Sequence, residues 1–312
     1  MDKIISVVGS TGTGKSDLAV RLAKVFNGEV ISADSMQVYR NMDIGTAKIT
    51  PEEMDGVPHH LIDIQPFDEP YNVKIFQDKS REAIQDILSR GKLPILCGGT
   101  GLYTKAAVYD YEFSQEEEDP KLRAELESLS NEELVERLKR EDPSALDKIH
   151  PNNRKRLIRA LMMSATGDLK TDREARQKHA PLYDVFFIGL CADRSLVDQR
   201  IEKRVDRMFD AGLVEEAERL FSDPKTWSYT SFQGIGYKEF QGYFEGTKSL
   251  EQVKNEIVIH SRQYAKRQMT WFRHQMNVTW FDLEHPQAIE QAVKEWLENG
   301  TERKDEDSAS AE

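Results

Sequence analysis

A glycine-rich segment near the start of the chain has the spacing GxxxxGK[ST], between a strand-like run, KIISVVG, and a helical pattern. Glycines let backbone N–H groups converge on phosphates, and the start of a helix adds its positive end. A lysine and a serine at these positions pair with phosphate oxygens and offer a hydroxyl to Mg²⁺. The sequence therefore predicts that a diphosphate or triphosphate binds Gly9, Ser10, Thr11, Gly12, Thr13, Gly14, Lys15 and Ser16, with Ser16 as the Mg²⁺ ligand.

A second candidate for chemistry is Asp34, in the segment EVISADSMQVYR. It follows a strand-like run that begins at Glu29, so its carboxylate is expected at the carboxyl edge of a parallel sheet, where such folds bind ligands. There it can hold Mg²⁺, as in a nucleotide kinase, or take a proton from an acceptor substrate. The loop and Asp34 alone leave phosphoryl transfer and other reactions of diphosphates open.

Short apolar runs alternate with helical patterns through the first hundred residues, which predicts an α/β fold. The expected architecture is a parallel sheet like that of P-loop kinases, with helices on both faces. From about residue 116 the sequence becomes charged and helix-rich, and a buried strand, LYDVFFIGLCAD, returns near residue 183. We therefore expect a discontinuous catalytic core, residues 1–115 and 183–312, and an all-helical insertion domain, residues 116–182. Residues 300–312 are expected to form a disordered tail.

Local signals add three boundaries. Ser130 and Glu133 have the spacing of a capping box, which predicts a helix start inside the insertion. Gly91 is expected to end a helix, because glycine is the usual residue after a helix C-terminus. A long helix is expected from about Ser249 to His274.

The net charge of −12 disfavours a nucleic-acid partner at first sight, because phosphates repel acidic surfaces. The charge is unevenly distributed, however. Residues 282–312 hold ten acids and three bases, whereas residues 150–179 hold eight bases and three acids. A solvated helix face is the ordinary interpretation of such a basic run, and RNA binding is the alternative.

Two cysteines, Cys97 and Cys191, lie in apolar runs that are typical of buried thiols rather than of a disulfide or a zinc site. The sequence has no apolar run long enough for a membrane helix and no leader after Met1. We therefore expect a cytoplasmic protein without a membrane partner, acting as a monomer.

Nine segments, in order from the first strand to about residue 282, resemble the tRNA dimethylallyltransferase family of bacterial type. They are GSTGTGKS (9–16), SADSMQVYR (32–40), DIGTAK (43–48), VPHHLID (57–63), CGGTGLY (97–103), PNNRKRLIRAL (151–161), RIEKRVDRMFDAGLVEE (200–216), QGIGYKE (233–239) and YAKRQMTWFR (264–273). The resemblance implies transfer of a dimethylallyl group from dimethylallyl diphosphate to the exocyclic amine of the adenosine 3′-adjacent to the tRNA anticodon. Diphosphate is then the leaving group, and Mg²⁺ is the expected cofactor.

The resemblance also implies catalytic roles. Asp34 matches an acid that contacts the adenine amine, and we assign it as the general base, because this amine is a poor nucleophile until its proton is held or removed. Thr100 matches a contact near the target base. Arg204 matches an arginine on the diphosphate, where a fixed cation stabilises charge on the leaving oxygens. Arg207 is a candidate for a second such arginine.

For RNA, the resemblance implies that the insertion domain binds the anticodon stem loop of tRNA. The implied tRNA contacts are Asp34, Ser35, Met36, Gln37 and Thr100 in the core, and Arg123, Asn153, Arg154, Lys155, Arg156 and Arg159 in the insertion. The pair His59-His60 is interpreted as loop structure or a substrate contact rather than as a metal site.

Two other functions share the same loop. A P-loop nucleotide or small-molecule kinase has the same sheet and an arginine-bearing helix after a late strand. An adenylate isopentenyltransferase performs the same prenyl chemistry on a free nucleotide. The basic helical insertion disfavours both, because neither enzyme needs a surface for RNA.

Overall fold

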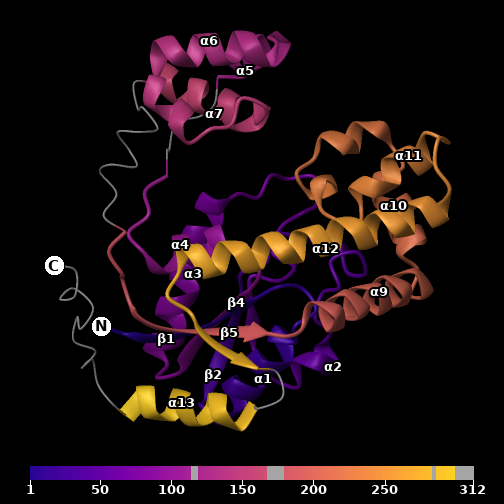
Figure 1. Ribbon diagram of the computed structural model, residues 1–312. Helices are drawn as coiled ribbons and strands as arrows, with labels where there is room; N and C mark the ends of the chain where they lie inside the picture. Colours follow the sequence, from indigo (N-terminus) through magenta and orange to yellow (C-terminus); the bar gives the residue numbers. More distant parts are fainter. Residues whose placement is uncertain (114–118, 167–178, 283–285, 299–312) are drawn as a thin grey trace. The chain divides into compact units, whose positions relative to one another are not determined.

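The structure of the chain is a computed structural model that describes residues 1–113, 119–166, 179–282 and 286–298. The described residues form two compact units, one from Met1–Tyr109 and the segment that starts at Pro181, the other from Asp110–Ala180 (Figure 1). The second unit therefore begins earlier in the chain than the insertion expected at residues 116–182. The predicted tail, residues 300–312, lies outside the described residues.

A six-stranded sheet runs through the first unit in the order β3-β2-β4-β1-β5-β6. Every pair of neighbouring strands is parallel, which confirms the expected α/β class. The central strand β1 leads into the glycine-rich loop. The strands are β1 Lys3–Gly9, β2 Gly28–Ser32, β3 His59–His60, β4 Leu93–Gly98, β5 Asp184–Cys191 and β6 Thr279–Asp282.

Helices cover both faces of this sheet, as expected (Figure 1). Successive residues of β1 point to opposite faces. Ile4 belongs to one apolar cluster, and Ile5 belongs to another. The cluster with Ile5 contains residues of α1 (Lys15–Val25) and α13 (Pro286–Glu298). The cluster with Ile4 contains residues of α3 (Val73–Ser89), α4 (Gly101–Val108), α9 (Arg194–Asp210), α10 (Leu213–Phe221) and α12 (Leu250–Gln275).

Local signals explain where several of these helices begin and end. Ser249 and Gln252 form a capping box at the start of α12, which confirms the long helix expected there. Gly91, with φ of +67°, follows the end of α3, as expected of a residue that adopts left-handed backbone readily.

Short helices lie at α2 (Pro51–Met54) and α11 (Gln241–Phe244). Within the described ranges, no helix is both long and apolar enough to span a bilayer.

The second unit is built from helices α5 (Pro120–Ser128), α6 (Asn131–Glu141) and α7 (Arg154–Ala165) and a short 3₁₀ helix, Pro143–Asp147. The predicted capping box is confirmed, since Ser130 accepts from the backbone N–H of Glu133 and the Glu133 carboxylate accepts from that of Ser130. The core of the unit includes the buried side chains of Leu126, Leu134, Leu138, Leu157 and Leu161.

The buried carboxylate of Glu29 on β2 links the edge strand β3 to residues just before β4. Its side chain is 2% exposed and accepts hydrogen bonds from both terminal nitrogens of Arg90 and, at 2.7 Å, from Lys92 Nζ. His60 Nε2 on β3 also lies 2.7 Å away. Hydrogen bonds from Arg90, then from Lys92 and His60, lower the pKa of Glu29 although burial opposes them.

We expect Glu29→Gln to lower the free energy of unfolding at neutral pH by about 3 kcal/mol, because Arg90 and Lys92 lose their buried counter-charge. The pKa of Glu29 is lower in the folded than in the unfolded chain. Its contribution is therefore complete above the unfolded pKa of 4.5 and is lost as the pH falls below that value. Urea denaturation of both proteins as a function of pH measures the difference.

Glu82→Gln, an exposed change on α3, is the control and should alter the free energy of unfolding by less than about 0.5 kcal/mol. Equal effects of the two substitutions, or a Glu29 effect that grows as the pH falls, would contradict the assigned role.

Candidate active site

The glycine-rich loop lies between β1 and α1, as the sequence predicts. Gly9, Gly12 and Gly14 have φ values of +145°, +85° and +74°, which residues with a side chain rarely adopt. Gly14 occupies the N-cap of α1 and offers no side-chain cap. The N–H groups at the start of α1 are therefore left for a ligand, and a helix start of this kind favours an anion.

Lys15 places its ammonium group inside this loop. Lys15 Nζ donates to the Ser10 carbonyl at 2.6 Å, and Thr13 Oγ1 donates to the same carbonyl at 2.8 Å. Burial lowers the pKa of Lys15 to about 8, and the positive charge of Arg204 acts in the same direction. An anion bound in the loop would raise the pKa of Lys15, because its negative charge stabilises the protonated form.

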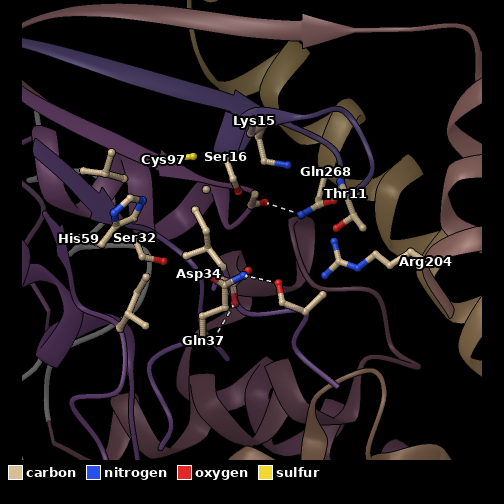
Figure 2. Close-up of a pocket in the computed structure, with 16 residues that line it drawn as sticks. Thr11, Lys15, Ser16, Ser32, Asp34, Gln37, His59, Cys97, Arg204 and Gln268 are labelled. Carbon is tan, nitrogen blue, oxygen red and sulfur yellow. Dashed lines mark hydrogen bonds between the residues drawn. The ribbon is translucent and has the colours of Figure 1, made fainter. Parts of the chain in front are cut away.

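Two cavities lie beside the loop, and Thr11, Asp34 and Arg204 line both of them. Figure 2 shows the first of these cavities. The first cavity contains Lys15 and Ser16, together with the apolar side chains of Val30, Ala47, Ile49 and Ile62. The second cavity is lined by Met36, Ile201, Val205, Met208, Gln233, Lys238, Tyr264 and Arg267, among others.

Asp34 lies two residues after the end of β2 and lines both cavities. Its Oδ1 accepts hydrogen bonds from the backbone N–H groups of Met36 at 2.8 Å and Gln37 at 3.2 Å, which fixes the turn that follows the strand. Ser35 and Met36 line the second cavity, whereas Gln37 lines the first. The predicted segment from Asp34 to Gln37 is thus divided between the two cavities.

Arg204 on α9 also lines both cavities, and its Nη2 donates to the Thr46 carbonyl at 3.0 Å. Burial lowers the pKa of Arg204, while Asp34 opposes this shift. Arg207 is exposed, hydrogen-bonds to the Lys203 carbonyl and lines neither cavity. Arg200, which was not predicted, reaches the loop instead, with Nη1 3.3 Å from the Gly12 carbonyl. The i, i+4 spacing of Arg200 and Arg204 was the available signal.

Gln268 on α12 links the glycine-rich loop to the turn after β4. It accepts from the Thr11 N–H at 2.9 Å and donates to the Gly99 carbonyl at 2.9 Å. Thr100, the next residue, is the N-cap of α4, and its side chain contacts the Tyr264 hydroxyl. Gln268 was not predicted as a site residue, because nothing in its local pattern distinguishes it from other polar residues of a long helix.

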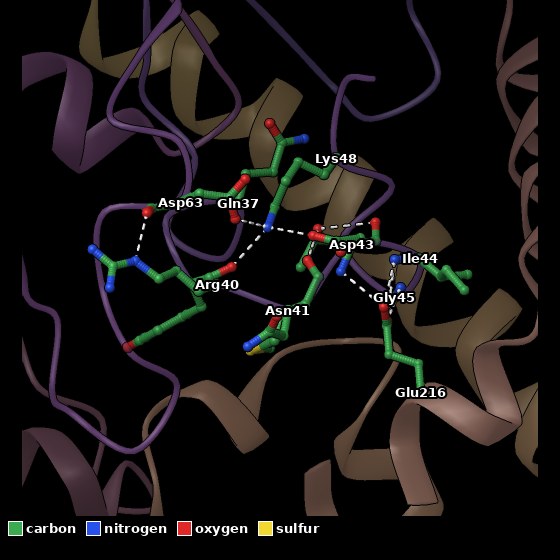
Figure 3. A network of polar contacts seen from close by, with 12 residues as sticks. Gln37, Arg40, Asn41, Asp43, Ile44, Gly45, Lys48, Asp63 and Glu216 are labelled. Atoms are coloured by element: carbon green, nitrogen blue, oxygen red, sulfur yellow. Dashed lines mark hydrogen bonds and ion pairs between the residues drawn. The ribbon is translucent and has the colours of Figure 1, made fainter. Parts of the chain in front are cut away.

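A buried glutamate fixes the loop that carries Thr46. Glu216 on α10, 4% exposed, accepts from the consecutive N–H groups of residues 43–45 at 2.9–3.1 Å and from the Tyr237 hydroxyl at 2.7 Å (Figure 3). A Cβ at Gly45 would lie 2.4 Å from the Tyr237 ring, so glycine is required at this position. Glu216 and Tyr237 therefore hold the loop at residues 43–45 against two segments that are distant in the sequence.

Lys48 holds the other end of the same loop. Its buried Nζ donates to the Tyr39 carbonyl and to Asp43 Oδ1, both at 2.7 Å, and pairs with Asp63 (Figure 3). Between the two anchors, the loop supplies the Thr46 carbonyl to Arg204 and the Ala47 carbonyl to Gln37 at 3.3 Å. Glu216 and Lys48 thus position site residues without lining either cavity.

The predicted Mg²⁺ ligand, Ser16, lines the first cavity together with Asp34. Mg²⁺ prefers oxygen ligands and is usually bound by one or two side chains plus substrate phosphates and waters. A hydroxyl and a carboxylate beside a phosphate loop fit this chemistry. The histidine pair has other partners: His60 contacts Glu29, and His59 Nδ1 lies 2.8 Å from the Val57 carbonyl.

In the second unit, the predicted RNA contacts differ in their surroundings. Arg123 pairs with Glu127 at 3.2 Å, and Asn153 caps α7 by accepting from the Arg156 N–H. Arg154 donates to the Glu127 carbonyl at 2.8 Å and to Asn131 Oδ1 at 3.1 Å, which ties α7 to α5 and α6. The exposed cationic side chains on α7 are those of Lys155, Arg156 and Arg159.

Comparison with known proteins agrees with these features. Residues 37–275 match the "IPP transferase" family model, and residues 2–70 match the "Isopentenyl transferase" model. A tRNA dimethylallyltransferase of Bacillus pumilus is 48% identical over 288 residues, which cover 91% of this chain and 90% of the relative.

Solved structures show the same fold. A tRNA isopentenylpyrophosphate transferase of Bacillus halodurans is 43% identical, with 95% of this chain and 96% of that chain covered and a TM-score of 0.72. A eukaryotic dimethylallyltransferase, solved in snapshots of its action on tRNA, is 31% identical, with 94% and 78% covered and a TM-score of 0.82. Sequence and fold together establish that the chain belongs to the tRNA dimethylallyltransferase family.

Proposed function

We propose that this enzyme transfers a dimethylallyl group from dimethylallyl diphosphate to the exocyclic amine of the adenosine 3′-adjacent to the anticodon of tRNA. The observation that carries the proposal is that two cavities meet at Asp34 and Arg204. Only the first of these cavities contains Lys15 of the phosphate loop. A donor bound in one cavity and a base bound in the other would meet at a carboxylate. The family relationship supports the reaction, and the junction supports its location in this chain.

The first cavity suits the donor. Its polar end has Lys15, Ser16 and the open start of α1, which match a diphosphate. Its apolar side chains, among them Val30, Ile49 and Ile62, match a short hydrocarbon. A nucleoside triphosphate would instead place a sugar and a base against these apolar side chains.

The second cavity suits a flipped-out base. Met36, Tyr264 and Arg267 offer a thioether, an aromatic ring and a guanidinium group, each of which packs against a planar base. The target adenine is stacked within the anticodon loop, so it must leave the stack to reach this cavity. Asp34 would then face its exocyclic amine.

The reaction follows from this arrangement. The adenine amine attacks C1 of the donor, a C–N bond forms, and the C1–O bond to diphosphate breaks. The Asp34 carboxylate accepts the proton that the amine loses. Lys15, Arg204 and the N–H groups of the loop stabilise the negative charge that grows on the leaving oxygens. Mg²⁺, held by the Ser16 hydroxyl and the diphosphate oxygens, would supply further positive charge to the leaving group.

The second unit supplies candidates for RNA backbone contacts. Lys155, Arg156 and Arg159 are exposed cations on one helix, and such side chains give phosphate binding that is independent of sequence. We assign them to the anticodon stem. Arg154 is better explained as a structural residue of the unit, because its guanidinium group is hydrogen-bonded within it. A tRNA substrate also implies a cytoplasmic enzyme.

Incubation with Mg²⁺, radiolabelled dimethylallyl diphosphate and either unmodified tRNA or AMP tests the function. We expect label in tRNA and none in AMP. Label in AMP alone would support an adenylate isopentenyltransferase, and turnover of ATP without prenyl transfer would support a kinase. Either result would overturn the proposal.

Asp34→Asn should lower kcat by about 10²-fold or more, because the amide cannot take up the proton. The Asn oxygen can still accept from the N–H groups of Met36 and Gln37, so the turn is preserved. Single-turnover rates with saturating tRNA measure the effect. Asp68→Asn, an exposed change, is the control. Wild-type rates in the Asp34 variant would remove it from the reaction.

Charge reversal of Lys155, Arg156 and Arg159 to Glu should raise the KM for tRNA about tenfold or more and leave kcat unchanged. The slope of log affinity against log salt should become shallower by about one for each phosphate that is no longer neutralised. Lys139→Glu on α6 changes charge in the same unit and serves as the control. An unchanged salt slope, or equal effects of the control, would exclude these side chains from the RNA interface.

A further inference from the structure

One buried side-chain amide, that of Gln268, connects two loops of the proposed active site. Its oxygen accepts from the Thr11 N–H at 2.9 Å, and its nitrogen donates to the Gly99 carbonyl at 2.9 Å (Figure 2). Thr11 belongs to the phosphate loop after β1. Gly99 belongs to the turn between β4 and α4, directly before Thr100.

Gln268 is buried and lies in close contact with Gly99. The residue is 6% exposed, and a Cβ at Gly99 would lie 2.1 Å from Gln268 Nε2. The φ angle of Gly99 is not in the left-handed region, so a side chain at this position would disturb the contact with Gln268 rather than the backbone conformation. A neutral amide both donates and accepts, whereas an ionised carboxylate only accepts and an ammonium group only donates.

The helix that carries Gln268 also reaches the second cavity. Tyr264 lies one helical turn earlier on α12, lines that cavity and contacts the Thr100 side chain. Gln268 therefore connects α12 to the phosphate loop. Gln268 and Tyr264 both connect it to the turn that contains Gly99 and Thr100. It is the element that joins the donor side of the site to the acceptor side.

We propose that Gln268 is a positioning residue that sets the separation between the bound diphosphate and the acceptor adenine. Its side chain lines the first cavity, and it acts by holding Thr11 and Gly99 in place. The proposal rests on the proposed function. In-line transfer needs the two reacting atoms about 3–3.5 Å apart, and a misplacement of about 1 Å can cost 10²-fold in rate. β1 and β4 are paired as far as Val8 and Gly98, and the Gln268 amide links the two loops beyond these last paired residues.

Gln268→Met tests this role, because methionine has a similar length and can form neither hydrogen bond. We expect kcat to fall about 30-fold or more, since alignment of bound substrates is lost. The KM values and the inhibition constant of pyrophosphate should stay within about threefold, because Gly9, Gly12, Gly14 and the bond from Thr13 to Ser10 still shape the loop. Gln263→Met, an exposed change on the same helix, should leave kcat unchanged.

A double-mutant cycle keeps the test independent of Gln268→Met. Gly99→Ala alone displaces the amide, and Gln268→Ala alone removes it. When both changes are combined, the new methyl group occupies space that the amide has left. If both residues act through one contact, kcat of the double variant should be no lower than that of the poorer single variant. Multiplied losses would overturn the proposal.

Two further outcomes distinguish the positioning role from the proposed function. Absence of prenyl transfer to tRNA by the wild-type enzyme would overturn the function itself. Wild-type transfer together with a Gln268→Met kcat within about threefold of wild type would overturn the positioning role alone. The positioning role would also be overturned if the loss of activity followed the folded fraction measured by circular dichroism, because kcat per folded molecule would then be unchanged.

Discussion

A concentration of positive charge governs the chemistry of this site. Lys15, Arg204 and the open start of α1 lie around one partly buried space, and the two cations each shift toward the neutral form because of burial. Asp34 opposes both shifts, but the pKa of each cation still lies below its ordinary value. A bound diphosphate completes the charge balance, and its departure as a leaving group uses the same cations that bind it.

Buried polar side chains that bind backbone groups hold the site in shape. Glu216 collects the N–H groups of residues 43–45, Lys48 binds the Tyr39 carbonyl, and Gln268 bridges Thr11 and Gly99. Each is buried, so an unmade hydrogen bond would cost free energy, and each therefore fixes its loop firmly. This explains how segments far apart in the sequence act as one site, since a side chain from one segment binds the main chain of another.

The parts of this structure that depend on local chemistry could be predicted from the sequence. They include the phosphate loop, the parallel sheet and the capping box at Ser130, which follow from spacing and periodicity. The anchors Glu216 and Gln268 could not, because their main-chain partners lie over a hundred residues away and leave no periodic trace. Arg154 illustrates the limit of charge as a signal, since a basic stretch does not show which cation is used internally. The roles of Asp34, Thr100 and Arg204 in catalysis stay predictions.

The central claim is that diphosphate binds the Gly9–Ser16 loop with its allyl group directed at Asp34 and the acceptor base. A crystal structure with the unreactive thiodiphosphate analogue of the donor and an anticodon stem-loop RNA tests it most directly. We predict phosphates on the loop, the five-carbon chain in the first cavity, and C1 between Asp34 and an extruded adenine. A hydrocarbon chain directed into solvent, or an adenine amine remote from Asp34, would contradict it.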